Sequence, residues 1–170
     1  DVFAAAAVGL GALGVVTEVE LACVPAYRLH AKESSEALSD LLPRLQAEAD
    51  THDHLDLHWF PHTDRVLVKR NDVVGAQQGP PPLAPWRARL DDDLLANRVF
   101  EVINRGAAAL PASVPVINRA TARVLGAREF ADDSWKVFCS SREVRFVESE
   151  YGVPRHALEA VLAELRAWFD

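Results

Sequence analysis

A cluster of potential metal ligands lies near the middle of this 170-residue chain. The stretch HDHLDLHWFPH holds four histidines and two aspartates: His52, His54, His58, His62, Asp53 and Asp56. Imidazole and carboxylate groups are the ligands of zinc, iron and manganese sites. On a strand, however, three of these side chains would share one face about 7 Å apart, and would splay rather than converge on a metal at about 2 Å. We interpret them as polar positions on the outer face of a half-buried strand, with a metal site as the alternative.

Two acidic patterns near the C-terminal end could carry acid–base chemistry. Glu143 and Arg145 are separated by one residue, and Glu148 and Glu150 share one face if the segment is extended. Paired carboxylates shift each other's pKa only when they are buried, and a charged, exposed strand face is the commoner arrangement. The chain also contains no nucleophile elbow and no Walker-type phosphate loop. We therefore predict no catalytic residue here.

The stretch GLGALGVVTEVEL, from Gly9 to Leu21, is rich in glycine and then alternates in the manner of a strand. Glycines at this density permit a tight turn or a close approach of the backbone to a ligand. A strand follows instead of a helix, so the dinucleotide fingerprint of a Rossmann unit is not matched. From the residues alone, a turn packed under its own sheet and a ligand-contacting segment both remain open.

Composition narrows the class of protein. The chain is 49% hydrophobic and 25% charged, with a formal net charge of -7. It has no basic stripe, which argues against a nucleic-acid partner. The apolar stretch VFAAAAVGLGALGVV is too short for a spanning helix and lacks the basic start of a signal peptide. Cys23 and Cys139 have no partner at metal-like spacing, so we expect two small buried residues in a reducing compartment, and a cytoplasmic protein.

The periodicities of the first half predict a sheet with one helix. Alternating residues from Val15 towards Leu29 predict a half-buried strand. Leu38 to Ala49 has helical spacing, with Ser34 or Ser35 as N-cap and Pro43 marking a kink or a restart. The segments HLDLHWF and RVLVKR, separated by a turn at His62–Asp64, predict a hairpin. Residues 72–87 are rich in glycine and proline and predict an ordered loop.

The second half adds helices and a further extended region. A helix beginning at Asp91–Asp93 and stopping at Arg105-Gly106 is expected, then one from Ser113 to Gly126. Residues 134–151 read as extended, with a turn at Ser140-Ser141. A last helix begins at Pro154. This order predicts an α+β fold, with an antiparallel sheet covered on one face by helices. Both ends look cut.

Three segments together resemble a known family. GLGALGVVTEVELACVPAYRLH, LHWFPHTDRVLVKR and SREVRFVESEYGVPRHAL match, in order and spacing, the sugar-lactone oxidases, flavoproteins of the vanillyl-alcohol oxidase superfamily. The matches span nearly the whole chain and are jointly specific, whereas the first alone is shared by many flavoproteins of that superfamily.

The resemblance implies that the chain contains parts of two domains. Residues 1–24 would be the last segment of an FAD-binding domain, and residues 25–170 a cap domain over the substrate, truncated at its C-terminus. The contacts with FAD would come from the glycine-rich segment, at Gly11, Ala12, Gly14, Val15 and Val16. The rest of the FAD site and a substrate-polarising Glu-x-Arg strand would lie outside residues 1–170, which leaves the fragment inactive alone.

For the parent protein the resemblance implies hydride transfer from a sugar 1,4-lactone to flavin, followed by electron transfer to oxygen or another acceptor. Its expected partners are the lactone and the absent FAD domain, with a homodimer and weak membrane association as further options. The alternative is a stand-alone α+β module that binds a ligand or a protein without catalysis.

Overall fold

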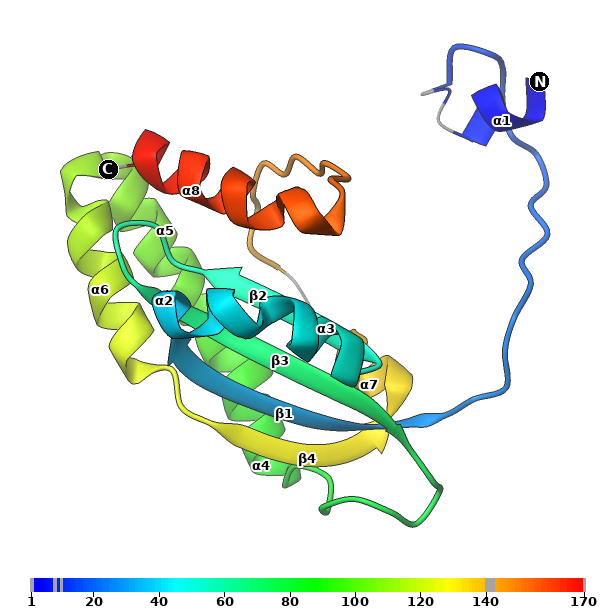
Figure 1. Cartoon of the computed structure of the whole chain (residues 1–170), viewed down its shortest axis with the longest axis horizontal. Coiled ribbons are helices and arrows are strands. Elements are labelled where there is room, and N and C mark those ends of the chain that lie inside the picture. Colours follow the sequence, from blue (N-terminus) through cyan, green and yellow to red (C-terminus); the bar gives the residue numbers. More distant parts are fainter. Residues whose placement is uncertain (1, 8, 10, 140–142, 170) are drawn as a thin grey trace.

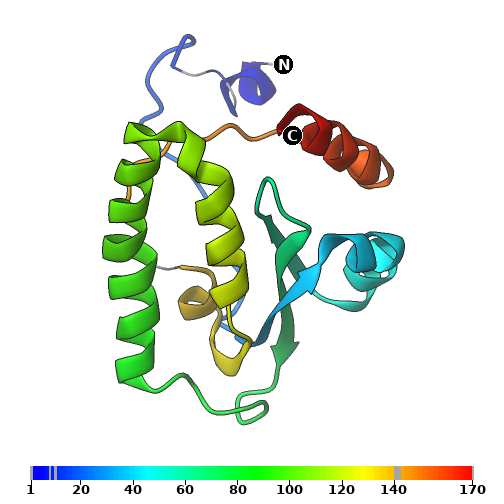
Figure 2. The same ribbon diagram turned by 90° about the vertical axis from the view of Figure 1, so that its left-hand side faces the viewer.

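The chain folds around an antiparallel sheet with helices on either side, as Figure 1 and Figure 2 show. The structure is a computed structural model and describes residues 2–7, 9, 11–139 and 143–169. Within these ranges the sheet has four strands in the order β2-β3-β1-β4. The predicted α+β class with an antiparallel sheet is therefore confirmed, whereas the helices lie on both sides of the sheet instead of the one face that was expected.

The bounds of the strands and helices are as follows. The strands are β1 (Arg28–Ala37), β2 (His54–Trp59), β3 (Arg65–Val74) and β4 (Arg128–Asp133). The α-helices are α1 (Val2–Ala7), α2 (Leu38–Leu41), α3 (Leu45–Thr51), α4 (Pro85–Ala88), α5 (Phe100–Ala109), α6 (Val114–Val124), α7 (Ser134–Phe138) and α8 (Leu158–Phe169). Single turns of 3-10 helix cover Leu42–Arg44, Pro111–Ser113 and Arg155–Ala157, and a π-helical stretch, Arg89–Val99, joins α4 to α5.

The predicted hairpin is confirmed and forms one side of the sheet. β2 pairs with β3 in antiparallel register, with Trp59 opposite Val66 and Leu57 opposite Val68. β3 continues to Val74, beyond the segment that the sequence predicted, because all ten of its residues pair with β1. The hairpin turn thus lies at one end of a long pair of strands, and it carries the residues discussed below.

One face of the sheet buries the apolar core beneath α2 and α3. Leu38, Leu41, Val66 and Val68 are almost completely buried, with Trp59 packed against them. α2 begins at Leu38, whereas Ser34 and Ser35 lie within β1 and cap no helix, so the predicted N-cap was wrong. The restart at Pro43 is confirmed, since a 3-10 turn with this proline near its start precedes α3.

The N-terminus of α2 is satisfied by the hairpin turn instead of a preceding serine. The Leu38 N–H donates to the Asp64 carbonyl at 2.9 Å. Asp64 Oδ1 accepts from the Ser39 N–H at 3.2 Å, and Oδ2 accepts from the Ser39 hydroxyl at 2.5 Å. A residue 25 positions away in the chain therefore performs the capping role that sequence assigned to a neighbour.

Two predicted extended segments were wrong. Residues 15–27 form no strand and are largely exposed, because no other strand pairs with their alternating residues. In the 134–151 segment, α7 occupies the beginning and residues 143–151 form neither helix nor strand, while the turn predicted at Ser140-Ser141 falls outside the described residues. The fourth strand is instead β4, which pairs with β1 across about a hundred residues of chain.

The helices of the second half agree better with their predictions. α6 and α8 lie where they were expected, and α8 brings Phe169 to within 5.9 Å of the Trp59 ring. The helix predicted from Asp91 to Gly106 begins earlier, at Pro85, and continues through Gly106 to Ala109. Pro85 suits a first turn, where its missing N–H has no partner to lose. Gly106, which was predicted to end this helix, therefore lies inside α5.

The last two expectations concern the burial of the two cysteines and a membrane-spanning helix. Cys23 and Cys139 are both exposed, so the prediction that they are buried was wrong. Among the helices of the described segments, none combines the length and the apolarity needed to cross a bilayer.

Candidate functional site

The segment predicted to contact FAD lies on an N-terminal arm that extends away from the sheet (Figure 1). Its turn is closed by a hydrogen bond from the Ala12 N–H to the Gly9 carbonyl at 2.8 Å. Val15 is 90% exposed and Val16 is 67% exposed. The alternative of a turn packed under its own sheet therefore does not describe this arrangement.

Both glycines of the predicted site adopt backbone angles that favour glycine. Gly11 has φ +79° and Gly14 has φ +128°, and a Cβ added at either would meet nothing within 4 Å. An L side chain rarely adopts such φ values, so the backbone conformation alone explains these glycines. The contact with a cofactor, including the parts assigned to Ala12, Val15 and Val16, stays a prediction.

Three histidines of the HDHLDLHWFPH segment, His52, His54 and His62, have separate partners. His52 Nδ1 is 2.8 Å from an Asp72 oxygen, and the His54 ring packs edge-on against Phe138 with centroids 5.0 Å apart. His62 lies on the hairpin turn beside Phe169. Within the described residues, no three histidine, cysteine, aspartate or glutamate side chains are grouped so as to hold a metal ion. These contacts favour the interpretation of the cluster as polar positions on a strand.

The acidic patterns near the C-terminal end do not form a pair of buried carboxylates. Glu148 and Glu150 are exposed. The backbone N–H of Glu143 donates to the side-chain oxygen of Asn97 at 2.8 Å, which joins this segment to the π-helical stretch. No observation gives the Glu143–Arg145 pair a chemical role.

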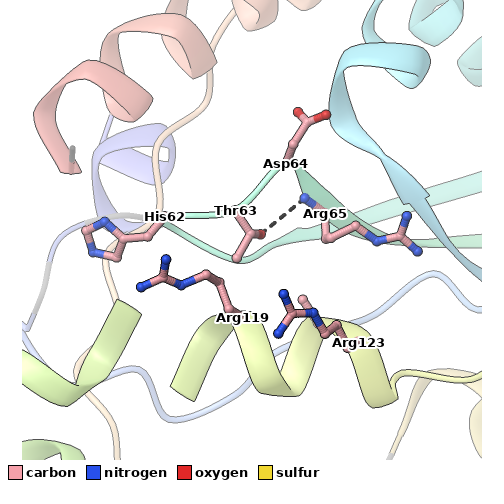
Figure 3. A pocket seen from close by; sticks show the side chains of 7 residues that line it. His62, Thr63, Asp64, Arg65, Arg119 and Arg123 are labelled. Atoms are coloured by element: carbon pink, nitrogen blue, oxygen red, sulfur yellow. Dashed lines mark hydrogen bonds between the residues drawn. The ribbon is translucent and has the colours of Figure 1, made fainter. Parts of the chain in front are cut away.

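A hollow of about 540 Å³ lies between the hairpin turn and α6. It is lined by His62, Thr63, Asp64 and Arg65 from the turn and by Arg119, Ala122 and Arg123 from α6. In Figure 3, Arg119 and Arg123 extend from the helix toward the turn, whereas Asp64 and Arg65 point away from them. Arg65 instead donates to the Ser35 carbonyl and hydroxyl at 3.0 and 2.9 Å.

The turn that forms one wall of the hollow is held by several hydrogen bonds. Thr63 Oγ1 donates to the Phe60 carbonyl at 2.8 Å and accepts from the Arg65 N–H at 3.1 Å. Asn118 Nδ2 donates to the Pro61 carbonyl at 3.1 Å and so fixes α6 to the turn. Ala122 is almost fully buried at this contact. The sequence had placed both segments but not their contact, which joins residues 57 positions apart.

A second charged group lies under α3, on the core face. Arg70 is 8% exposed and donates to Glu48 at 2.6 Å and to Glu36 at 2.8 Å. Burial raises the pKa of Glu36, but hydrogen bonds from Arg70, Ser34 and Arg44 outweigh it and lower that pKa to about 2. The hydrogen bond from Arg70 likewise lowers the pKa of Glu48. These paired charges connect β1, β3 and α3, and their arrangement is structural.

The opposite face of the sheet carries buried polar residues that sequence reasoning missed. Glu33 accepts a two-pronged interaction from Arg128, at 2.7 and 2.9 Å. Among the described residues, Asn71 Oδ1 is a buried side-chain oxygen without a hydrogen-bond partner. Glu33, Asn71 and Arg128 lie on three different strands, so only the strand register could have placed them together.

The sequence of this chain matches a known protein family over most of its length. The sequence profile of D-arabinono-1,4-lactone oxidase matches residues 19–170. The chain belongs to this family. The match includes every strand of the sheet and the hairpin turn, and it confirms the resemblance on which the sequence interpretation relied.

The individual relatives are named as lactone oxidases or dehydrogenases. The chain is 32% identical over 170 residues to L-gulono-1,4-lactone dehydrogenase of Mycobacterium tuberculosis and 30% identical over 174 residues to L-gulonolactone oxidase of Bos taurus. These alignments cover 98% and 100% of this chain. L-galactono-1,4-lactone dehydrogenase, mitochondrial, of Arabidopsis thaliana is 32% identical over 85 residues, or 50% of the chain and 14% of the relative.

The chain spans only part of these relatives. It corresponds to 39% of the mycobacterial protein and 38% of the bovine one. The family and the relatives are named for the oxidation of sugar lactones. Because the chain covers less than half of each relative, the activity of a whole protein is a matter for proposal.

Proposed function

We propose that this chain is the substrate-covering part of an FAD-dependent oxidoreductase that oxidises a sugar 1,4-lactone. The observation that supports this most is the family match over residues 19–170, together with relatives named as gulonolactone oxidases and dehydrogenases. In this proposal residues 1–24 end the FAD-binding domain, and residues 25–170 belong to the cap. The fragment has no activity of its own.

The N-terminal arm supports a contact with flavin through its shape. Nothing lies within 4 Å of the positions that a Cβ would take at Gly11 and Gly14. Exposed apolar side chains follow at Val15, Val16 and Leu21, and an apolar surface of this kind is typical of a segment that packs against a further domain. The residues present therefore fit a cofactor approached by backbone atoms.

When bound, FAD supplies the acceptor for the hydride removed from the lactone carbon. The contribution of this chain is positional: the arm at Gly11 and Gly14 would contact the cofactor, and the cap would cover the lactone and exclude water.

The first test uses the complete gene product and this chain in parallel. Under anaerobic conditions, L-gulono-1,4-lactone should bleach the flavin absorbance of the complete protein, whereas this chain with added FAD should show no flavin reduction. A complete protein without flavin, or turnover by this chain alone, would contradict the proposal.

The second test addresses the predicted cofactor residues in the complete protein. Gly14→Ala should lower the amount of FAD that copurifies, because the added Cβ disfavours φ +128°. Gly126→Ala is the matched control, since nothing lies within 4 Å of its added Cβ and its φ is not positive. Equal FAD content in the two variants would argue against a contact at Gly14.

A further inference from the structure

The hollow between the hairpin turn and α6 is positively charged in an acidic chain. The chain as a whole has a formal net charge of -7, yet three arginines and one aspartate line this hollow. Arg65 is directed away to Ser35, so the positive charge beside the hollow comes from Arg119 and Arg123 on α6. The aspartate, Asp64, is directed to the other side of the turn, where it accepts from Ser39 and lies 3.5 Å from Arg166. Little negative charge from the chain therefore reaches the space beside Arg119 and Arg123.

The two arginines of α6 lie one helical turn apart and point the same way (Figure 3). Like charges at this spacing repel. Arg119 Nε donates to the Pro115 carbonyl at 2.9 Å. Among the described residues, no carboxylate lies within ion-pairing distance of either guanidinium, whereas Arg105 on α5 pairs with Glu101 at 2.7 Å. An anion between Arg119 and Arg123 would relieve the repulsion.

The hairpin turn, which faces the arginines across the hollow, is held in one conformation by hydrogen bonds. Two hydrogen bonds of Thr63 close the turn, and Asn118 joins it to α6. His62 has φ +64°, an uncommon value for a residue with a side chain. Backbone held in such a conformation tends to occur where a ligand or a contact is presented. A ligand entering the hollow would therefore not need to order the turn.

We propose that this hollow is a binding site for a small oxyanion, held between the guanidinium groups of Arg119 and Arg123 and bordered by His62 and Thr63. A guanidinium matches the geometry of two oxygens of a carboxylate or a phosphate and binds them with two parallel hydrogen bonds. The ligand is thus a small molecule that carries one of these two groups.

The two groups could come from different sources. Inorganic phosphate or a phosphate ester would supply one. A sugar acid would supply the other, and this case rests on the proposed function, because water opens a sugar lactone to the corresponding hydroxy acid. The experiment separates the two, and phosphate binding would stand even if the lactone activity did not.

The test is a titration of the ¹⁵N-labelled chain, at constant ionic strength, with inorganic phosphate and separately with gulonate, using chloride as the reference anion. We expect saturable shifts of the amide signals of residues 62–65 and 119–123 with at least one of the two. The double variant Arg119→Gln, Arg123→Gln should weaken that binding about tenfold, the scale expected for losing two exposed charge pairs.

The control is Arg105→Gln, which removes the same kind of charge from an exposed position on α5, 80% exposed at its side chain. It should bind as the unaltered chain does, and circular dichroism of all variants confirms that they fold. Saturation by phosphate alone, or by gulonate alone, identifies the group recognised. Shifts equal to those with chloride, shifts spread over the surface, or binding unaffected by the double variant would overturn the proposal.

Discussion

The N-terminal arm and the first strand of the sheet adjoin in sequence and both alternate apolar with polar residues, yet only the strand is buried. Val15, Leu21 and Val24 are between 74% and 90% exposed, whereas Leu29 and Ala31 of β1 are fully buried. β1 pairs with β3 on one side and β4 on the other, while the arm has no pairing strand. Alternation predicts an extended backbone, but partners decide whether it is buried.

The largest contrast should come from removing one leucine side chain from each region. Leu41, the fully buried last residue of α2, changed to alanine should lower the free energy of unfolding by about 2–5 kcal/mol, through lost burial and a cavity. Leu21→Ala removes the same atoms from a side chain that is 76% exposed and should change stability by less than about 0.5 kcal/mol. Urea denaturation measures both, and comparable losses would mean that the arm packs on the core.

A second contrast uses two glycines that share a positive φ. Gly79 has φ +91°, and an added Cβ would lie 2.8 Å from the Cβ of Ala131 on β4. Gly79→Ala should therefore cost about 1–3 kcal/mol through overpacking and strain.

Gly11→Ala is the matched change on the arm, where φ is +79° and the space is open. Its strain should stay local, because the arm can shift without disturbing the sheet, and the midpoint of thermal unfolding should not move. A lowered midpoint for Gly11→Ala would show that the two regions unfold together.

The smallest contrast is in pH dependence. The pKa of Glu36 in the folded chain is about 2, below its ordinary value of 4.5. The unfolded chain therefore binds more protons at this site between these values, so the stabilisation is complete above about pH 4.5 and is lost as the pH falls toward 2. Glu36→Gln should flatten the loss of stability over this window.

Glu148→Gln is the control, at an exposed position of a segment without helix or strand. It should leave the dependence of the free energy of unfolding on pH unchanged. Unfolding curves measured at several pH values between 2 and 6 compare the two variants. An identical slope for both would show that the Glu36–Arg70 interaction does not control stability in acid.

The parts of the fold that could be predicted are those that depend on neighbours in sequence. The β2–β3 hairpin, the restart at Pro43 and helices α6 and α8 all follow from local spacing and turn chemistry. β4 was missed because its only described strand partner, β1, lies about a hundred residues earlier. The cap of α2 was misplaced for the same reason, since Asp64 comes next to α2 only because Ala37 of β1 pairs with Arg65 of β3.

The same difference between local patterns and contacts of distant residues applies to the candidate sites. The positive φ of Gly11 and Gly14 follows from their residue type, whereas their contact with a cofactor stays a prediction. The spacing of Arg119 and Arg123 on a predicted helix was also visible, but their position opposite the hairpin turn depends on a contact that no local pattern encodes. Glu33 and Arg128 meet only because β1 and β4 pair.

The position of β4 has a consequence for the order in which the sheet can assemble. The Arg65–Val74 strand and its two neighbours are complete once residue 74 has been synthesised, but β4 begins at Arg128, after a long helical excursion. Closing so long a loop is entropically unfavourable and slows folding. On the ribosome, β1 would therefore wait with one edge open until its last partner emerges, and this nascent edge is where a chaperone would be needed.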